Sequence, residues 1–143
     1  MNFILRHLVC ALMMALVISC GRNEPLSQYV PKSPQEASLK SVLLVFENGV
    51  NTRDAGKIEN IIHADASLMI GRERTILSKA VYSKILPKRL AENPPMTMGK
   101  PKMKVSGDQA EVKIYVTRGS YNGLMVFNMI WEDSKWYIKS WKY

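Results

Sequence analysis

Residues 110–117 read Ala-Glu-Val-Lys-Ile-Tyr-Val-Thr, and apolar side chains occupy every second position of this stretch. Ala110, Val112, Ile114 and Val116 therefore point to one side of an extended chain. The charged and polar residues between them point to the other side. This period of two predicts a β-strand with one buried face and one solvated face.

Further strands are predicted on both sides of this stretch. Before it, a short extended segment ends in a turn at residues 106–109. After it, a glycine-containing loop leads to residues 124–131, which are apolar on both faces except at Asn128. Such a run is typical of a central strand that is covered on both sides. A last strand is predicted at residues 136–143, after one more turn.

Helical patterns precede the strands. Ser33-Pro34-Gln35-Glu36 is a capping box, and apolar residues then recur at helical spacing as far as residue 50. A second, shorter helix is predicted after Asp54, and a short strand at residues 67–70. A third helix is predicted after Ser78, with a kink or break at Pro87 because proline cannot donate a backbone hydrogen bond. Helices followed by an antiparallel meander indicate an α+β fold.

The chain opens with an apolar segment that ends in Val17-Ile18-Ser19-Cys20-Gly21. The apolar run at residues 8–18 is shorter than the roughly 20 residues that a membrane span needs, so a cleavable signal peptide is the better interpretation. The motif resembles the lipobox of bacterial lipoproteins. That resemblance implies cleavage before Cys20 and attachment of lipid, including an acyl chain such as palmitate, to Cys20.

The expected organisation is therefore a lipoprotein signal peptide at residues 1–19, a lipidated Cys20 with a flexible tether at residues 20–33, and one α+β domain at residues 34–143. The expected location is the cell envelope, with the protein lipid-anchored in a bacterial membrane. Gly21 follows the cysteine where an aspartate would favour the inner membrane, so the periplasmic face of the outer membrane is favoured in a Gram-negative cell.

Positive charge is concentrated in one part of the chain. The formal net charge is +8, and residues 72–104 hold nine Lys and Arg side chains against Glu73 and Glu92. Export argues against nucleic acid as a partner. Three interpretations stay open: a solvated face, a surface that faces anionic lipid head groups, and a site for an anionic ligand or partner.

The sequence resembles the nuclear transport factor two-like superfamily over residues 34–143. The resemblance rests on the opening amphipathic helix, the link Asn51-Thr52-Arg53-Asp54, the strand entry Ala64-Asp65-Ala66-Ser67 and the ending Trp136-Tyr137-Ile138-Lys139-Ser140-Trp141. It implies a curved antiparallel sheet wrapped around N-terminal helices as a cone, with a pocket at the open end. The superfamily includes ketosteroid isomerases and scytalone dehydratases as well as binding modules, so the fold alone implies no activity.

The sequence offers little for catalysis. Isomerase chemistry needs a carboxylate base in an apolar pocket, and no acid falls on an inward-pointing strand position. Asp65 is expected in a cap or turn, and Glu111 on an outward face. His63 is the only histidine after the predicted cleavage and is expected to pair with carbonyls at a helix end. No metal site and no cofactor are predicted.

The candidate pocket is Asn128, the one polar residue in its strand, with aromatic walls. Those walls are Tyr82, Tyr115, Trp131 and Trp141. Aromatic walls with one polar group suit a small, largely apolar ligand. The favoured function is binding of an apolar or amphipathic ligand, or of a partner protein, without catalysis. The alternatives are an isomerase or dehydratase, and an interaction module that forms a homodimer through its sheet face.

Overall fold

The computed structural model describes residues 24–143, and its first long helix is α2 (Pro34–Asn51). The predicted cap is present, because the Ser33 hydroxyl accepts a hydrogen bond from the Glu36 amide at 3.1 Å. One side of the helix is buried. Its buried residues are Leu39, Leu43, Phe46, Gly49 and Val50. The capping box and the apolar spacing therefore predicted this helix correctly.

Two further helices follow the predicted caps. α3 (Ala55–Glu59) begins after Asp54, whose carboxylate accepts from the Lys57 amide at 3.1 Å. α4 (Lys79–Glu92) begins after Ser78, whose hydroxyl accepts from the Val81 amide at 3.4 Å. The predicted break at Pro87 is absent: α4 continues through this residue, which is exposed. No helix within residues 24–143 is long and apolar enough to cross a membrane.

The strands form one sheet in the order β2-β1-β7-β6-β5-β3, with β4 also paired to β5. They are β1 (Ile62–Ile70), β2 (Thr75–Ser78), β3 (Met96–Met98), β4 (Lys102–Ser106), β5 (Gln109–Arg118), β6 (Tyr121–Glu132) and β7 (Lys135–Lys142). All neighbours are antiparallel except β1 and β7, which run parallel. The sequence patterns did not predict β2, β3 or the first half of β1.

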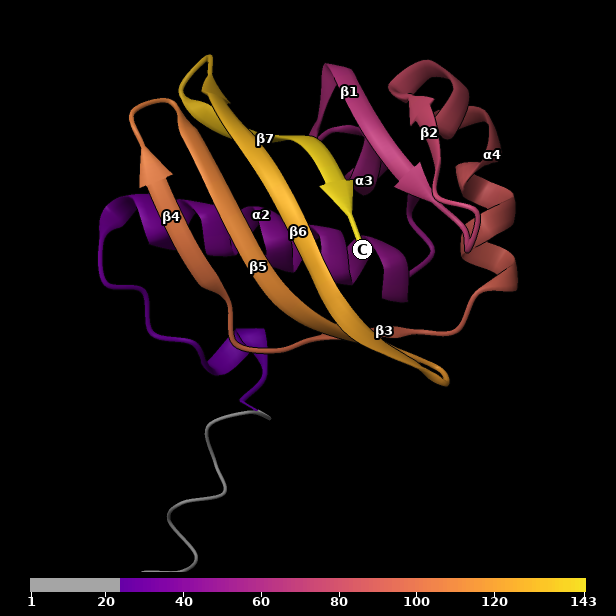
Figure 1. Ribbon diagram of the computed structural model, residues 1–143, viewed down its shortest axis with the longest axis horizontal. Helices are drawn as coiled ribbons and strands as arrows, with labels where there is room; N and C mark the ends of the chain where they lie inside the picture. The colour runs from indigo at the N-terminus through magenta and orange to yellow at the C-terminus, as the bar shows by residue number, and fades with distance from the viewer. Residues whose placement is uncertain (1–23) are drawn as a thin grey trace, which may run out of the picture.

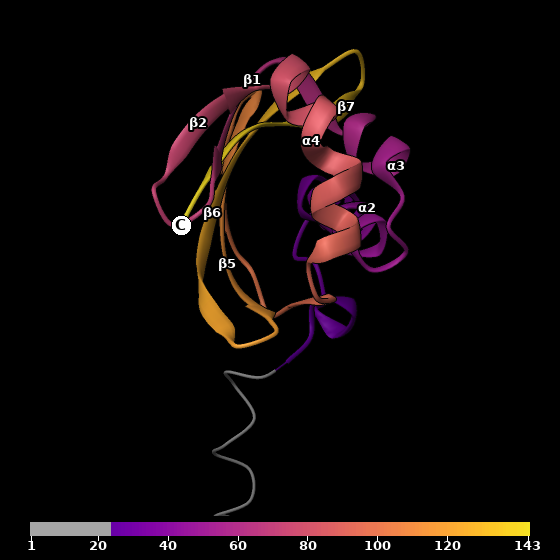
Figure 2. The same cartoon turned by 90° about the vertical axis from the view of Figure 1, so that its right-hand side faces the viewer.

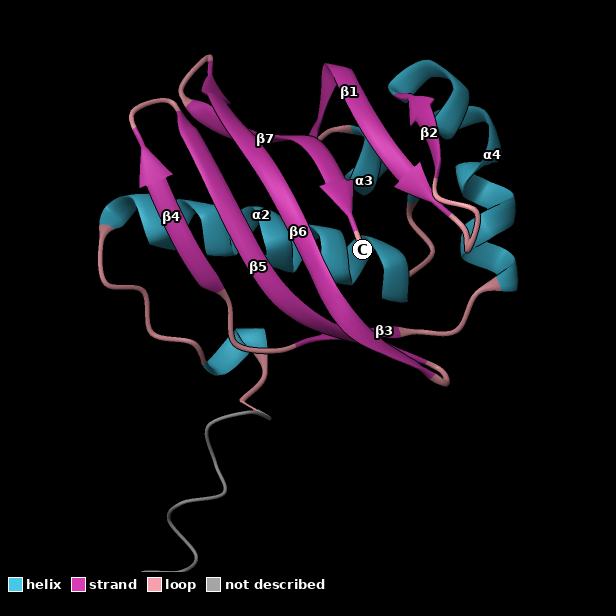
Figure 3. Ribbon diagram, in the orientation of Figure 1, coloured by secondary structure: helices cyan, strands magenta, loops and turns pink. Residues whose placement is uncertain are grey.

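The sheet is curved, and the helices α2, α3 and α4 lie on its concave side (Figures 1 and 2). Register irregularities lie in the β1–β7 and β6–β7 pairings, and such irregularities increase bending and twist. The predicted fold class is therefore confirmed: an α+β fold with a curved, open, mainly antiparallel sheet around N-terminal helices. Figure 3 shows the same layers by secondary structure.

The core lies between the concave face and α2. Val112, Ile114 and Val116 point inward as predicted, together with Phe127 and Met129 of β6. The prediction that β6 is covered on both sides is wrong. Leu124 on the convex side remains 39% exposed, because no helix within residues 24–143 packs on that side of the sheet (Figure 2).

Side chains of α2 tether the short strand β3. The Asn51 side chain pairs with the Met96 backbone through two hydrogen bonds, of 2.8 and 2.7 Å. The Glu47 carboxylate accepts from the Met98 amide at 3.1 Å, and burial raises the pKa of that carboxyl above its ordinary value. These bonds replace a strand partner on one edge of β3 and fix the end of α2 against the sheet.

The predicted flexible tether is wrong from Glu24 onward. Leu26 begins a short 3-10 turn, η1 (Leu26–Gln28), and is fully buried in the core. Lys40 of α2 donates to the carbonyls of Ser27 and Tyr29 at 2.9 and 2.7 Å. The domain therefore includes this segment. The predicted signal peptide and Cys20 lie outside the described residues.

Candidate ligand-binding cavity

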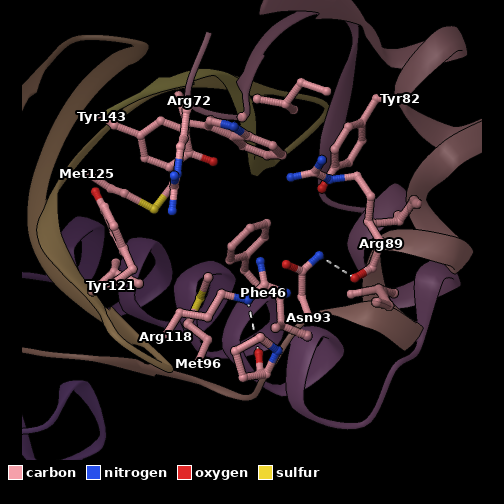
Figure 4. Close-up of a pocket in the computed structure, with 18 of the residues that line it drawn as sticks. Phe46, Arg72, Tyr82, Arg89, Asn93, Met96, Arg118, Tyr121, Met125 and Tyr143 are labelled. Atoms are coloured by element: carbon pink, nitrogen blue, oxygen red, sulfur yellow. Dashed lines mark hydrogen bonds between the residues drawn. The ribbon is translucent and has the colours of Figure 1, made fainter. Parts of the chain in front are cut away.

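A cavity of about 330 Å³ lies at the open end of the cone, between α4, the end of α2 and the concave face of the sheet (Figure 4). Its volume is at the lower end of the range for small-molecule pockets. Its apolar walls come from several elements: Phe46, Leu86, Leu90, Met96, Val116 and Met125. A cavity with such walls favours a ligand that has a compact apolar body.

An aromatic cluster forms one wall of this cavity. The Trp141 ring makes edge contacts with Phe46 and Tyr82, at centroid distances of 5.4 and 5.2 Å. Its indole Nε1–H donates to the Met69 carbonyl at 2.6 Å, which links β7 to β1. Because both ring and indole N–H are fixed, this wall is preformed.

Four arginines line the same cavity. Arg72 and Arg74 lie in the turn between β1 and β2, Arg89 lies in the last turns of α4, and Arg118 ends β5. Figure 4 shows Arg72, Arg89 and Arg118 approaching the open centre from different sides. No Asp or Glu side chain is among the lining residues of the described chain. The cavity is therefore apolar at its walls and positive overall.

Arg118 is held in place and half buried. Its Nε–H donates to the Pro94 carbonyl at 3.0 Å. Burial lowers the pKa of the Arg118 guanidinium below its ordinary value, and the nearby charge of Arg89 acts in the same direction. Burial also raises the pKa of Tyr82 to about 12, so this hydroxyl stays protonated and can donate a hydrogen bond near neutral pH.

The structure brings together two of the five predicted pocket residues. Tyr82 and Trp141 line the cavity. Of the other three, Tyr115 and Asn128 lie on the convex face of the sheet. Trp131 lies on the concave side at the other end of the sheet, where its ring contacts Trp136 at a centroid distance of 5.5 Å. Tyr115 is 61% exposed, Trp131 is 41% exposed, and the Asn128 amide donates to the Ser140 hydroxyl at 2.9 Å. Placing these three in the pocket was wrong. Tyr115 and Asn128 alternate with inward-pointing neighbours along their strands, and Trp131 lies near the start of α2, away from the cavity.

The arginines were missed by the sequence interpretation, although signals for them were present. Three of them, Arg72, Arg74 and Arg89, belong to the basic stretch at residues 72–104. Arg118 has the same parity as Ile114 and Val116, so continuing the period of two would have placed it on the inward face.

His63 makes side-chain contacts and does not pair with helix carbonyls as predicted. It lies in β1, where Nε2 is 2.6 Å from the Glu132 carboxylate and Nδ1 is 3.2 Å from the Lys139 ammonium. The Asp65 amide also donates to Nδ1 at 3.1 Å. Among residues 24–143, no group of three His, Cys, Asp or Glu side chains is arranged to hold a metal ion.

Comparison with known proteins gives structural neighbours only. No family model matches the sequence, and no curated protein matches it. Among solved structures, an NTF2-like protein of unknown function from Shewanella baltica shares 12% identity at a TM-score of 0.64, over 79% of this chain and 94% of that chain. The chain has an NTF2-like fold.

Other neighbours of this NTF2-like domain carry varied descriptions. A putative calcium/calmodulin dependent protein kinase II association domain from Xanthomonas campestris aligns at a TM-score of 0.66 and 12% identity, over 83% of this chain and 91% of that one. A putative scytalone dehydratase from Novosphingobium aromaticivorans aligns at 0.58 and 9%, over 75% and 80%. At these identities the likeness shows the fold, and the function has to be argued from the cavity.

Proposed function

We propose that this NTF2-like protein is a lipid-anchored protein of the bacterial cell envelope that binds a small apolar or amphipathic molecule in its cone, without catalysis. The observation that carries the proposal is the preformed cavity, with an aromatic wall built on Trp141 and apolar walls from the helices and the sheet. Concave apolar sites with a few convergent polar groups are the usual form of small-molecule sites.

The side chains around the cavity favour binding over acid–base catalysis. Isomerase and dehydratase chemistry of the kind seen in this fold uses a carboxylate or imidazole to move a proton. The lining residues of the described domain include no Asp, Glu, His, Cys or Ser. The nearest imidazole candidate, His63, is engaged with Glu132 and Lys139 and does not line the cavity.

Two features support a lipid anchor: the lipobox-like motif, and the short distance in sequence between Cys20 and the start of the folded domain. Only residues 21–23 separate Cys20 from Glu24, the first described residue. Three extended residues span at most about 10 Å. A lipid on Cys20 would therefore hold the domain close to the membrane surface, because the segment after Glu24 is part of the fold and adds no reach.

A cavity-filling substitution tests the binding site. N-phenyl-1-naphthylamine, a neutral aromatic probe, should bind the protein saturably at one site. Met125→Trp fills the cavity from the sheet and should weaken this binding at least about tenfold, the scale on which a poorly fitting side chain alters a packed site. Leu124→Trp is the matched control, because Leu124 is 39% exposed on the convex face and does not line the cavity. Equal effects of the two variants would contradict the proposed site.

The anchor has its own test. Cys20→Ser should abolish metabolic labelling with an alkyne palmitate analogue and should move the protein from the membrane fraction to the soluble fraction, because the sulfur that would carry the lipid is gone. Cys10→Ser is the control and should leave labelling unchanged. Persistent labelling of the Cys20→Ser protein would refute the anchor.

A further inference from the structure

The four cavity arginines have no carboxylate partner in the domain. Residues 1–23 contain no Asp or Glu, so every acidic side chain of the protein lies within the described residues. The ion pairs there are formed by other groups: Lys57 with Asp54, His63 with Glu132, Lys88 with Glu92, Lys100 with Glu24, and Lys113 with Glu111. The positive charge of the cavity is therefore not neutralised by the protein's own acids.

Two of these arginines are close enough to disfavour each other. Arg89 and Arg118 are both partly buried, and both line the cavity together with Tyr82 and Tyr143. The charge of Arg89 helps to lower the pKa of Arg118. Partly buried like charges cost free energy unless a counter-charge is present. An anion placed between them would remove this cost.

The terminal guanidinium nitrogens of Arg118 remain available to donate hydrogen bonds to a ligand in the cavity. The Arg118 Nε–H is used by the Pro94 carbonyl, which orients the guanidinium and leaves its two terminal nitrogens to donate. A guanidinium fork matches the oxygens of carboxylate, sulfonate and phosphate groups. The apolar walls formed by Phe46, Met125 and Trp141 lie beside these donors in the same cavity (Figure 4).

We infer that the ligand is an amphipathic anion whose head group binds between Arg89 and Arg118 and whose apolar body lies against Phe46, Met125 and Trp141. This inference rests on the proposed function, since it names the chemical class of ligand for the same cavity. Arg72 and Arg74, on the turn between β1 and β2, add positive charge at the exposed rim and attract the anion. The cavity thus selects a ligand with a negative charge at one end and an apolar surface at the other.

A matched pair of probes tests the charge preference. 8-Anilinonaphthalene-1-sulfonate and N-phenyl-1-naphthylamine share their rings and differ by the sulfonate. The wild-type protein should bind the sulfonate about tenfold more tightly, the factor expected from one charge-assisted hydrogen bond. Arg118→Met and Arg89→Met should each reduce this ratio toward one and leave the affinity for the neutral probe within about twofold, because methionine keeps the apolar stem.

Lysines on the convex face provide the control. Lys113 and Lys142 flank Val126 on neighbouring strands and are both exposed. Lys113→Met and Lys142→Met remove the same charge and should leave the ratio of the two affinities unchanged. If these variants lower the ratio as much as the arginine variants do, the sulfonate binds at the surface and the inference is overturned. Far-ultraviolet circular dichroism and thermal unfolding establish that each variant is folded, and Arg118→Lys should restore part of the preference if Arg118→Met is unstable.

The results distinguish failure of the anion inference from failure of the proposed function. Equal affinity of the wild-type protein for both probes overturns the anion inference and leaves the binding cavity intact. Saturable binding of neither probe overturns the proposed function itself. Competition then identifies the body of the ligand: displacement of the sulfonate probe by decanoate supports an acyl chain, and displacement by 2-naphthoate supports an aromatic acid. Equally effective displacement by inorganic phosphate would contradict recognition of an apolar body.

Discussion

Replacing Leu26 by alanine should lower the free energy of unfolding by about 3 kcal/mol. Leu26 lies eight residues before the first long helix, yet it is 0% exposed and belongs to the main apolar core. Truncation removes the buried methyl groups and leaves a cavity that the fixed surroundings cannot fully close. Urea unfolding followed by tryptophan fluorescence measures the loss.

Val30→Ala is the matched control for this prediction. Val30 belongs to the same segment and is 78% exposed, so its truncation should change stability by less than about 0.5 kcal/mol. If Leu26→Ala were as mild as Val30→Ala, the segment after Glu24 would be a flexible tether, as the sequence predicted for residues 20–33. A large loss in Leu26→Ala alone would show that the domain begins before Ser33.

Replacing Trp141 by alanine should cost about 4 kcal/mol, the upper part of the range for buried aromatic residues. Trp141 is 3% exposed and packs against Phe46, Tyr82 and Phe127. Its indole also bonds the Met69 carbonyl across the only parallel strand pair of the described sheet. Thermal and urea unfolding should both detect the change.

Two other variants distinguish the contribution of the Trp141 hydrogen bond from that of burying its ring. Trp141→Phe keeps most of the ring and loses the hydrogen bond, so it should cost about 1–2 kcal/mol. Trp131→Ala removes the same side chain at the other end of the sheet, where it is 41% exposed, and should cost less than Trp141→Ala. A similar loss for Trp131→Ala and Trp141→Ala would contradict the conclusion that Trp141 is a buried core residue and Trp131 is not.

The sequence correctly predicted those helices and strands whose conformation is determined by interactions between residues close together in the chain. The Ser33 cap and the alternation at residues 110–117 each describe interactions that operate within a few residues, and both agree with the structure. β3 escaped prediction because it is three residues long and receives hydrogen bonds from Asn51 and Glu47 of a distant helix. Leu26 escaped for the same reason, since its partners are distant in sequence.

The candidate site was predicted in part. Tyr82 and Trp141 were chosen for their aromatic rings and do line the cavity. Tyr115 and Trp131 have aromatic rings too and lie outside the cavity. Strand parity places Tyr115 on the convex face, and Trp131 lies near the start of α2, at the other end of the concave side. Arg72 and Arg118 come from a turn and a strand end that only the folded sheet brings together.

The central claim is that an amphipathic anion binds inside the cone, and the three indole N–H signals of the ¹⁵N-labelled protein test it most directly. Trp141 lines the cavity, whereas Trp136 and the partly exposed Trp131 lie side by side near the start of α2, away from it. Titration with 8-anilinonaphthalene-1-sulfonate should shift the Trp141 indole signal saturably and leave the Trp131 signal in place. A saturable shift of Trp131 with Trp141 unmoved would place the ligand near the start of α2, outside the cavity, and contradict the account.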